Sequence, residues 1–127
     1  MYAAYDKDFK KVLIKDAVSG TEYVCPVCKK RLFIKTGNRK KAHFCHFPNE
    51  SCIDYWNYDE SDWSDQWKNA FPKNEVEIVH EDHHIDLEIK NTLGVMFQSK
   101  NMRRETFIEK TDYMLNNIRN VLWLFNL

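Results

Sequence analysis

A Cys-x-x-Cys pair constrains this chain more than any other feature of its sequence. Cys25 and Cys28 enclose Pro26 and Val27, a spacing that presents two thiolates from one tight turn. Fourteen residues then separate Cys28 from His43, the first of several further Cys and His residues, and that interval is typical of two ligand pairs around zinc. We therefore predict a structural, four-ligand Zn²⁺ site in the first half of the chain.

The sequence offers more candidates for the second ligand pair than zinc needs, namely His43, Cys45, His46 and Cys52. The His-x-x-His pair matches zinc-finger spacing best, and Cys52 is the reserve ligand. On a regular strand His43 and Cys45 would share one face while His46 points away, so the backbone must turn for the two histidines to meet. The predicted ligands are Cys25, Cys28, His43 and His46, and the choice of Cys45, His46 or Cys52 for the fourth position stays open.

The cysteines are also compatible with two disulfides, so the cellular compartment matters. The first residues lack the apolar stretch of a secretory signal, and no apolar run approaches the roughly 20 residues of a membrane span. We expect a cytoplasmic protein with no membrane partner, in which thiols stay reduced and bind metal. Beyond the metal, no small-molecule cofactor is expected.

Charge is distributed unevenly along a chain whose formal net charge is zero. Residues 1–48 hold eleven Lys and Arg against four Asp and Glu, and residues 49–127 hold eight against fifteen. Basic residues surround the Cys-x-x-Cys turn with aromatic residues between them. This pattern is typical of a nucleic-acid contact surface, although an ordinary solvated basic face has the same composition. The predicted DNA-contacting residues are Lys29, Lys30, Arg31, Lys35, Arg39, Lys40 and Lys41.

The hydrophobic pattern changes near the middle of the chain. Short apolar or β-favouring runs separated by turns predict small strands over residues 2–35 and 42–47. From residue 60 the spacing becomes helical, with Ser61 as a capping residue and Trp63 and Trp67 expected in the core. The later segments predict strands over 75–80, 83–90 and 94–99, a helix over 104–118, and a strand buried on both faces over 120–127.

In its motifs and their order, the chain resembles the competence protein CoiA-like family. The matching features are Cys25-Pro-Val-Cys28, His43-Phe-Cys-His46, Glu60-Ser61, His84-Ile-Asp86, Phe97-Gln98 and Val121-Leu-Trp-Leu124. The resemblance implies an α+β protein in two parts: a zinc-finger-like β-rich ribbon over residues 1–56, and a minimal PD-(D/E)xK restriction-endonuclease-like core over residues 57–127. The helix, three strands, helix, strand order is also the core order of that nuclease fold.

The resemblance assigns a catalytic set that would bind Mg²⁺ and activate water. Asp86 matches the metal-binding Asp of the family, and Glu88 shares its strand face and could assist. On the next strand Met96 replaces an acidic ligand while Gln98 is kept, and an alternative register places Lys100 as the lysine of the (D/E)-x-K tripeptide. A thioether is a poor ligand for a hard ion, so Met96 argues against hydrolysis, and a Met96→Glu change could partly restore it.

Two further positions depart from the family pattern, since Ser64 stands where relatives often carry His and Lys110 where Arg is common. We therefore predict a degenerate nuclease that binds single- or double-stranded DNA, or inhibits a nucleic-acid-processing protein, without chemistry. Its setting would be DNA uptake, recombination or conflict with phages and mobile elements. The alternative is an active Mg²⁺-dependent DNA endonuclease or exonuclease.

Overall fold

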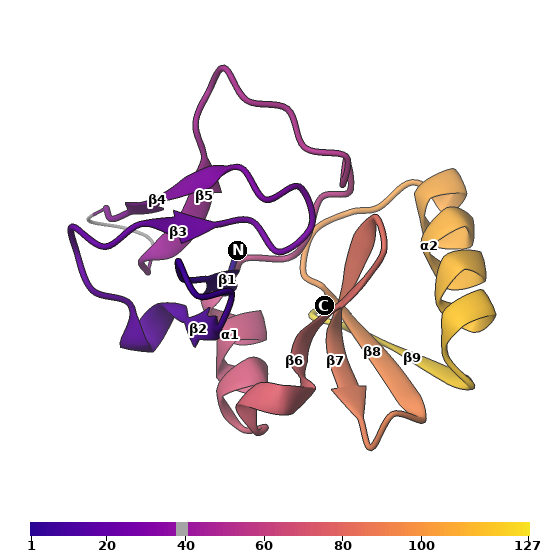
Figure 1. Ribbon diagram of the computed structural model, residues 1–127. Helices are drawn as coiled ribbons and strands as arrows, with labels where there is room; N and C mark the ends of the chain where they lie inside the picture. Colours follow the sequence, from indigo (N-terminus) through magenta and orange to yellow (C-terminus); the bar gives the residue numbers. More distant parts are fainter. Residues whose placement is uncertain (38–40) are drawn as a thin grey trace. The chain divides into compact units, whose positions relative to one another are not determined.

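The computed structural model describes residues 1–37 and 41–127, which form two compact units (Figure 1). The first unit contains Met1–Trp56 and Glu81–His83, and the second contains Asn57–His80 and His84–Leu127. The combination of two α-helices, an antiparallel sheet and a mixed sheet confirms the α+β class. Neither helix has the length and apolar character required to cross a bilayer, among the residues described.

The first unit is a five-stranded antiparallel sheet in the order β2-β1-β3-β4-β5. Its strands are β1 (Ala3–Tyr5), β2 (Lys11–Leu13), β3 (Tyr23–Val24), β4 (Arg31–Lys35) and β5 (His43–His46), with a short 3-10 helix at Ile14–Asp16. Such short strands bury little apolar surface, and the core of the unit is a cluster of Ala4, Tyr23, Cys25, Leu32 and Phe44. A core this small gives a metal centre an important share in stability.

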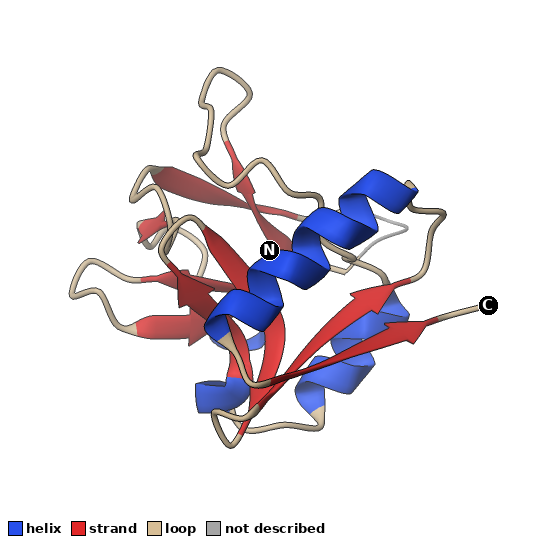
Figure 2. Cartoon of the chain, turned by 90° about the vertical axis from the view of Figure 1, so that its right-hand side faces the viewer, coloured by secondary structure: helices blue, strands red, loops and turns tan. Residues whose placement is uncertain are grey.

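The second unit is a four-stranded mixed sheet in the order β6-β7-β8-β9. Its elements are α1 (Asp62–Asn69), a 3-10 helix (Lys73–Glu75), β6 (Val76–His80), β7 (His83–Ile89), β8 (Leu93–Gln98), α2 (Arg104–Asn117) and β9 (Asn120–Phe125). Strands β7 and β8 are antiparallel, whereas β8 and β9 are parallel and are connected through α2, which lies across the sheet in Figure 2. The predicted order of helix, three strands, helix and strand is confirmed.

The two faces of this sheet carry different helices. Consecutive strand residues point to opposite faces, and Met96 packs in an apolar cluster with Met114 of α2 while Phe97 contacts α1. At Gly94 a Cβ would lie 2.7 Å from Cδ1 of Ile118, the C-cap residue of α2, so a larger residue there would require the Ile118 side chain to move. Packing against both faces therefore fixes the positions of the residues on β7 and β8.

Helix α1 begins as predicted, since the Ser61 side chain accepts a hydrogen bond from the backbone N–H of Ser64. Its buried stripe, however, is polar: Ser64 and Lys68 are fully or almost fully buried. The core position predicted for Trp67 is wrong, because 41% of this residue is exposed, although its ring stacks on Phe97. A polar stripe one position further along the helix takes the place of the expected apolar one.

Strand β9 also differs from its prediction. A strand buried on both faces was expected from its apolar run, but β9 lies at the edge of the sheet, and Leu122 and Phe125 are 44% and 48% exposed. Its apolar side chains thus belong partly to the surface of this unit.

Candidate metal centre

The Cys-x-x-Cys segment forms a closed turn between β3 and β4. The backbone N–H of Lys29 donates to the Cys25 carbonyl at 2.9 Å, and the N–H of Cys25 donates to the Lys30 carbonyl at 2.8 Å. Lys29 adopts φ 63°, in the left-handed region that such a tight turn needs. The N–H of Val27 also lies 3.4 Å from the Cys25 sulfur, an arrangement that favours a thiolate there.

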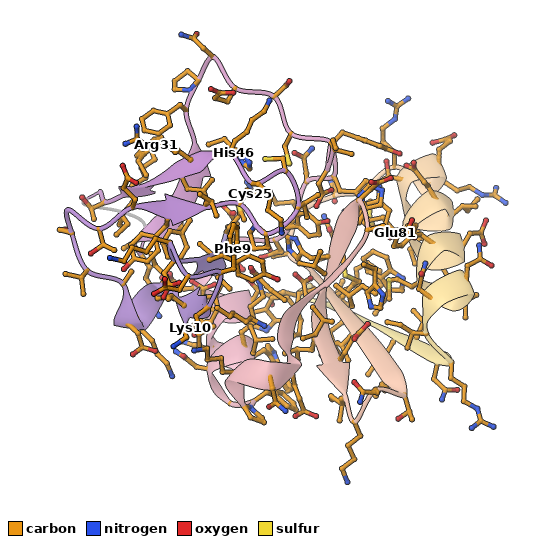
Figure 3. All side chains as sticks on the ribbon, in the orientation of Figure 1. Phe9, Lys10, Cys25, Arg31, His46 and Glu81 are labelled. Carbon is orange, nitrogen blue, oxygen red and sulfur yellow. The ribbon has the colours of Figure 1, made fainter. Side chains whose placement is uncertain are left out.

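A histidine and a third cysteine complete a cluster with these two thiols. His46, the last residue of β5, places Nε2 3.3 Å from the sulfur of Cys28, and Cys52 places its sulfur 3.9 Å from that of Cys25. Cys25 and His46 are neighbours in Figure 3. The ligand atoms of Cys25, Cys28, His46 and Cys52 all lie within 4.8 Å of one another.

These distances fit a tetrahedral zinc ion. With Zn–S bonds of about 2.3 Å and Zn–N bonds of about 2.0 Å, ligand atoms around one ion are about 3.5–3.8 Å apart. The separations of 3.9 Å and 3.3 Å are close to these values, and the 3.9 Å between the two sulfur atoms is far longer than a disulfide bond. Three thiols and one imidazole are a frequent structural zinc set, so the cluster is able to hold a metal ion such as Zn²⁺ with no ligand position left for a substrate.

The protonation states of the cluster agree with a role in metal binding. Burial raises the pKa of the Cys25 thiol to about 12 and also raises that of Cys52, while burial lowers the pKa of His46. Without a cation, burial thus favours the protonated thiols of Cys25 and Cys52 and the neutral imidazole of His46. A divalent ion would displace the thiol protons and receive a lone pair from neutral His46.

Two of the candidate ligands lie outside this cluster. Strand β5 remains regular to its end, so His43 and Cys45 share one face and Phe44 and His46 share the other, as the pairing with β4 shows. The Nδ1 atom of His43 is 3.1 Å from the Lys41 carbonyl. The turn that would have joined His43 to His46 is absent from this described strand, and the reserve ligand Cys52 occupies the expected place of His43.

Cys52 reaches the cluster because the connector after β5 folds back over the Cys-x-x-Cys turn. A backbone hydrogen bond from Glu50 to the Phe47 carbonyl closes a turn at 2.9 Å. The Lys30 ammonium then donates to the Ser51 carbonyl at 2.7 Å, next to Cys52. The sequence signals for this return were Pro48 and the presence of a fourth cysteine, but neither gives its direction.

The basic residues predicted to contact DNA are partly used inside the first unit. The Lys29 ammonium donates to the Pro26 carbonyl at 2.6 Å, and Lys30 adds an ion pair with Glu50 at 3.5 Å to its contact with the connector. Arg31 forms an exposed ion pair with Glu22 at 3.7 Å. The contacts of these three residues therefore stabilise the surroundings of the candidate metal centre, in addition to any role of their charges in binding DNA.

Two other basic residues, Lys35 and Lys41, are exposed at the ends of the segment that joins β4 to β5. Lys35 is paired with His43 across the two strands, which places its side chain on the face opposite to His46. The remaining residues predicted for this surface, Arg39 and Lys40, lie outside the described residues.

The predicted catalytic residues occupy separate environments in the second unit. Asp86 is fully buried on β7, and its Oδ2 accepts a hydrogen bond from the backbone N–H of Phe97 at 3.0 Å. Glu88 is also buried and contacts Nε2 of His80. Both carboxylates thus have protein partners.

Gln98 and Lys100 lie where β8 ends, and the Gln98 amide donates to the Lys100 carbonyl at 2.8 Å. Met96 is buried against Ile85 and Met114, and its sulfur is 3.5 Å from the backbone nitrogen of Asp86. In the part of the chain that the structure describes, the cysteine–histidine cluster is the group of acidic, Cys and His side chains suited to a metal ion.

Asp86 belongs to a buried ion triad with Lys68 and Glu77, and the sequence analysis predicted no role for these two partners. The Lys68 ammonium of α1 lies 2.9 Å from Oε2 of Glu77 and 3.4 Å from Oδ1 of Asp86. Lys68 and Glu77 are 2% and 6% exposed. Burial alone would raise the pKa of the Glu77 carboxyl, but the Lys68 ammonium and further positive charges near the carboxyl together hold that pKa well below its ordinary value.

The fold and the cluster define the first unit as a small antiparallel β protein with a Cys₃His candidate metal centre. The family model of the competence protein CoiA N-terminal domain matches residues 6–53, a range that includes all four cluster residues. This match supports the resemblance of the first unit to the CoiA-like family. No curated protein and no solved structure matches the chain.

Proposed function

We propose that this protein is a zinc-stabilised, competence-related DNA-binding protein whose second unit is a restriction-endonuclease-like core without hydrolytic activity. The strand order of that unit and the parallel β8–β9 pair connected through α2 support the nuclease-like assignment. The family match of the first unit supports the relation to DNA uptake.

One observation carries the loss of chemistry: an internal ammonium is ion-paired with the carboxylates. The Lys68 ammonium lies 2.9 Å from Glu77 and 3.4 Å from Asp86, so part of the negative charge that would attract Mg²⁺ is already balanced by a buried cation. The other oxygen of Asp86 accepts a backbone N–H, and Met96 supplies a thioether where the resemblance expects a carboxylate. A hard divalent ion thus meets no set of two accessible carboxylates here.

The structure also changes the expectation for Met96→Glu. Met96 is 1% exposed and packs with Ile85, Met114 and Ile118. A glutamate there would bury a carboxylate among apolar side chains without a cation of its own. We therefore expect destabilisation of the second unit and no gain of cleavage from this substitution.

DNA binding is assigned to the exposed lysines of the first unit, Lys35 and Lys41. Phosphate contacts release counterions, so the affinity of the protein for DNA should fall steeply as salt rises. We expect the Lys35→Ala/Lys41→Ala protein to bind more weakly, with a salt slope reduced by about two because about one unit is lost per contact.

Fluorescence anisotropy with labelled DNA over a salt series measures this effect. The matched control is Lys10→Ala/Lys15→Ala, which removes the same charge from exposed positions near β2 in the same unit. We expect the control to keep the native slope. A native protein that fails to bind DNA at about 50 mM salt, where nonspecific contacts are strong, contradicts the proposed function.

A further inference from the structure

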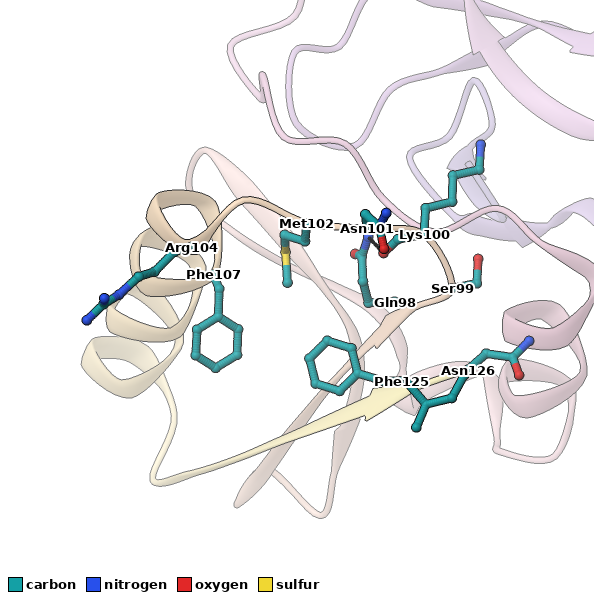
Figure 4. Close-up of a pocket in the computed structure, with 10 residues that line it drawn as sticks. Gln98, Ser99, Lys100, Asn101, Met102, Arg104, Phe107, Phe125 and Asn126 are labelled. Carbon is teal, nitrogen blue, oxygen red and sulfur yellow. Dashed lines mark hydrogen bonds between the residues drawn. The ribbon is translucent and has the colours of Figure 1, made fainter.

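A solvent-open pocket of about 710 Å³ lies at the end of the parallel strand pair in the second unit (Figure 4). Gln98 and Phe125, the last residues of β8 and β9, are register partners, and the N–H of Asn126 extends the ladder by donating to the Gln98 carbonyl at 3.0 Å. The first turn of α2 forms the other side. Carboxyl ends of parallel strands beside the start of a crossover helix are frequent ligand sites, and this volume is within the usual range of about 300–1,000 Å³.

Two aromatic rings face this pocket from different elements. Phe107 reaches it from α2 and Phe125 from β9 (Figure 4). They are 36% and 48% exposed, and each ring packs against Trp123, with ring centroids 5.2 Å and 5.8 Å away. Exposed rings on a rigid aromatic support form a surface on which a planar ligand can stack.

The charge of the lining differs from that of its surroundings. Residues 49–127 carry fifteen acidic and eight basic side chains, yet Lys100 and Arg104 line the pocket together with no acidic side chain among its described lining residues. Arg104 stands in the first turn of α2, where the helix dipole disfavours a cation, so helix stability does not explain its position. Amides of Gln98 and Asn126 add donors and acceptors at the rim.

We propose that this pocket binds a nucleotide of single-stranded DNA. The base stacks on Phe107 and Phe125, the amides meet its edge, and Lys100 and Arg104 contact the adjoining phosphates. Aromatic stacking with cations along the backbone is the general chemistry of single-strand recognition. A duplex does not fit this site because the faces of its bases are covered by neighbouring bases. The inference deepens the proposed DNA binding, on which it rests, by adding a second, strand-selective site.

The experiment compares the affinities of full-length variants for a labelled oligothymidylate of about five nucleotides and for a duplex. Phe125→Ala should weaken single-strand binding about tenfold, and Phe125→Leu should do nearly the same, because leucine keeps apolar bulk but has no ring face. Lys100→Ala/Arg104→Ala should weaken it and flatten its salt dependence. Leu122→Ala on the same strand and Arg119→Ala beyond the other end of α2 are matched controls that should bind as the native protein does.

The outcomes separate the two proposals. Weaker single-strand binding in the pocket variants, with unchanged controls and native thermal unfolding, supports the site. If the native protein binds the oligonucleotide and the pocket variants bind it equally well, the pocket inference is overturned while the proposed DNA binding stands. If the native protein binds neither DNA, the proposed function fails and the inference fails with it.

Discussion

Replacing Cys52 with serine is expected to release the metal ion and unfold much of the first unit, whereas replacing His43 with alanine should leave both intact. Cys52 supplies one of the four clustered ligand atoms. His43 lies on the face of β5 opposite to the cluster residue His46. Structural zinc contributes about 10–16 kcal/mol to the folding of small domains, and even outer-shell partners change zinc affinity roughly 10- to 100-fold. Loss of a direct ligand should therefore lower affinity by more than about 100-fold.

Elemental analysis after dialysis against a mild chelator, together with hydrogen exchange of the β4 and β5 amides, tests this prediction. The native protein should retain about one zinc per chain, as a single four-ligand site requires. Cys45→Ser is the matched control, because Cys45 lies on the face of β5 opposite to His46. Zinc retained by Cys52→Ser but lost by His43→Ala would show that the two histidines are the ligands after all.

The second large effect is expected from replacing Lys68 with methionine. Methionine fills a similar volume but leaves the carboxylates of Glu77 and Asp86 buried without their cation. Removing one partner from a buried ion group typically costs about 3–5 kcal/mol. We expect the second unit of Lys68→Met to unfold at much lower denaturant concentration than in the native protein at neutral pH.

The pH dependence should reverse in this variant. In the native protein Lys68 holds the pKa of Glu77 below its ordinary value of 4.5, so the stabilisation by this group is present above that pH and is lost on acidification. In Lys68→Met the uncompensated carboxylates gain from protonation, so lowering the pH to about 4 should stabilise the variant while it destabilises the native unit.

Urea unfolding at neutral pH and at about pH 4 measures both effects. Lys73→Met, which changes an exposed lysine of the same unit, should behave as the native protein does. The triple variant Lys68→Met/Glu77→Gln/Asp86→Asn should regain most of the lost stability, because the whole ion group is then neutral. A Lys68→Met protein of native stability at both pH values contradicts the triad.

Periodicity predicted the secondary structure of the second unit well and its burial less well. The apolar run over residues 120–127 gave the strand but not its edge position, because the pattern of one strand does not show whether a neighbour pairs on each side. The spacing of Trp63 and Trp67 gave helix α1 but not its buried stripe. That stripe contains Lys68, whose burial depends on Glu77 and Asp86, residues that are near only after the sheet has formed.

In the candidate metal centre, too, the sequence predicted the local part of the site better than the part that depends on the fold. Local spacing predicted that the thiols of Cys25 and Cys28 lie together, as they do in the cluster, since a four-residue turn determines its own geometry. The partner ligands come from a strand and a returning connector, and the strict alternation of β5 selects His46 and excludes His43. Cys52 enters through the fold of the connector, which side-chain hydrogen bonds such as that of Lys30 determine.

A nuclease assay tests the central claim most directly, namely that the second unit keeps a nuclease-like architecture without its chemistry. Purified native protein is incubated with single- and double-stranded DNA in Mg²⁺ or Mn²⁺, and DNA binding is recorded on the same samples. Because Lys68 is ion-paired with the buried carboxylates and offsets part of their charge, we predict that the DNA is bound and remains intact over the full time course. Time-dependent, chelator-sensitive cleavage that disappears in a folded Asp86→Asn protein would contradict the account.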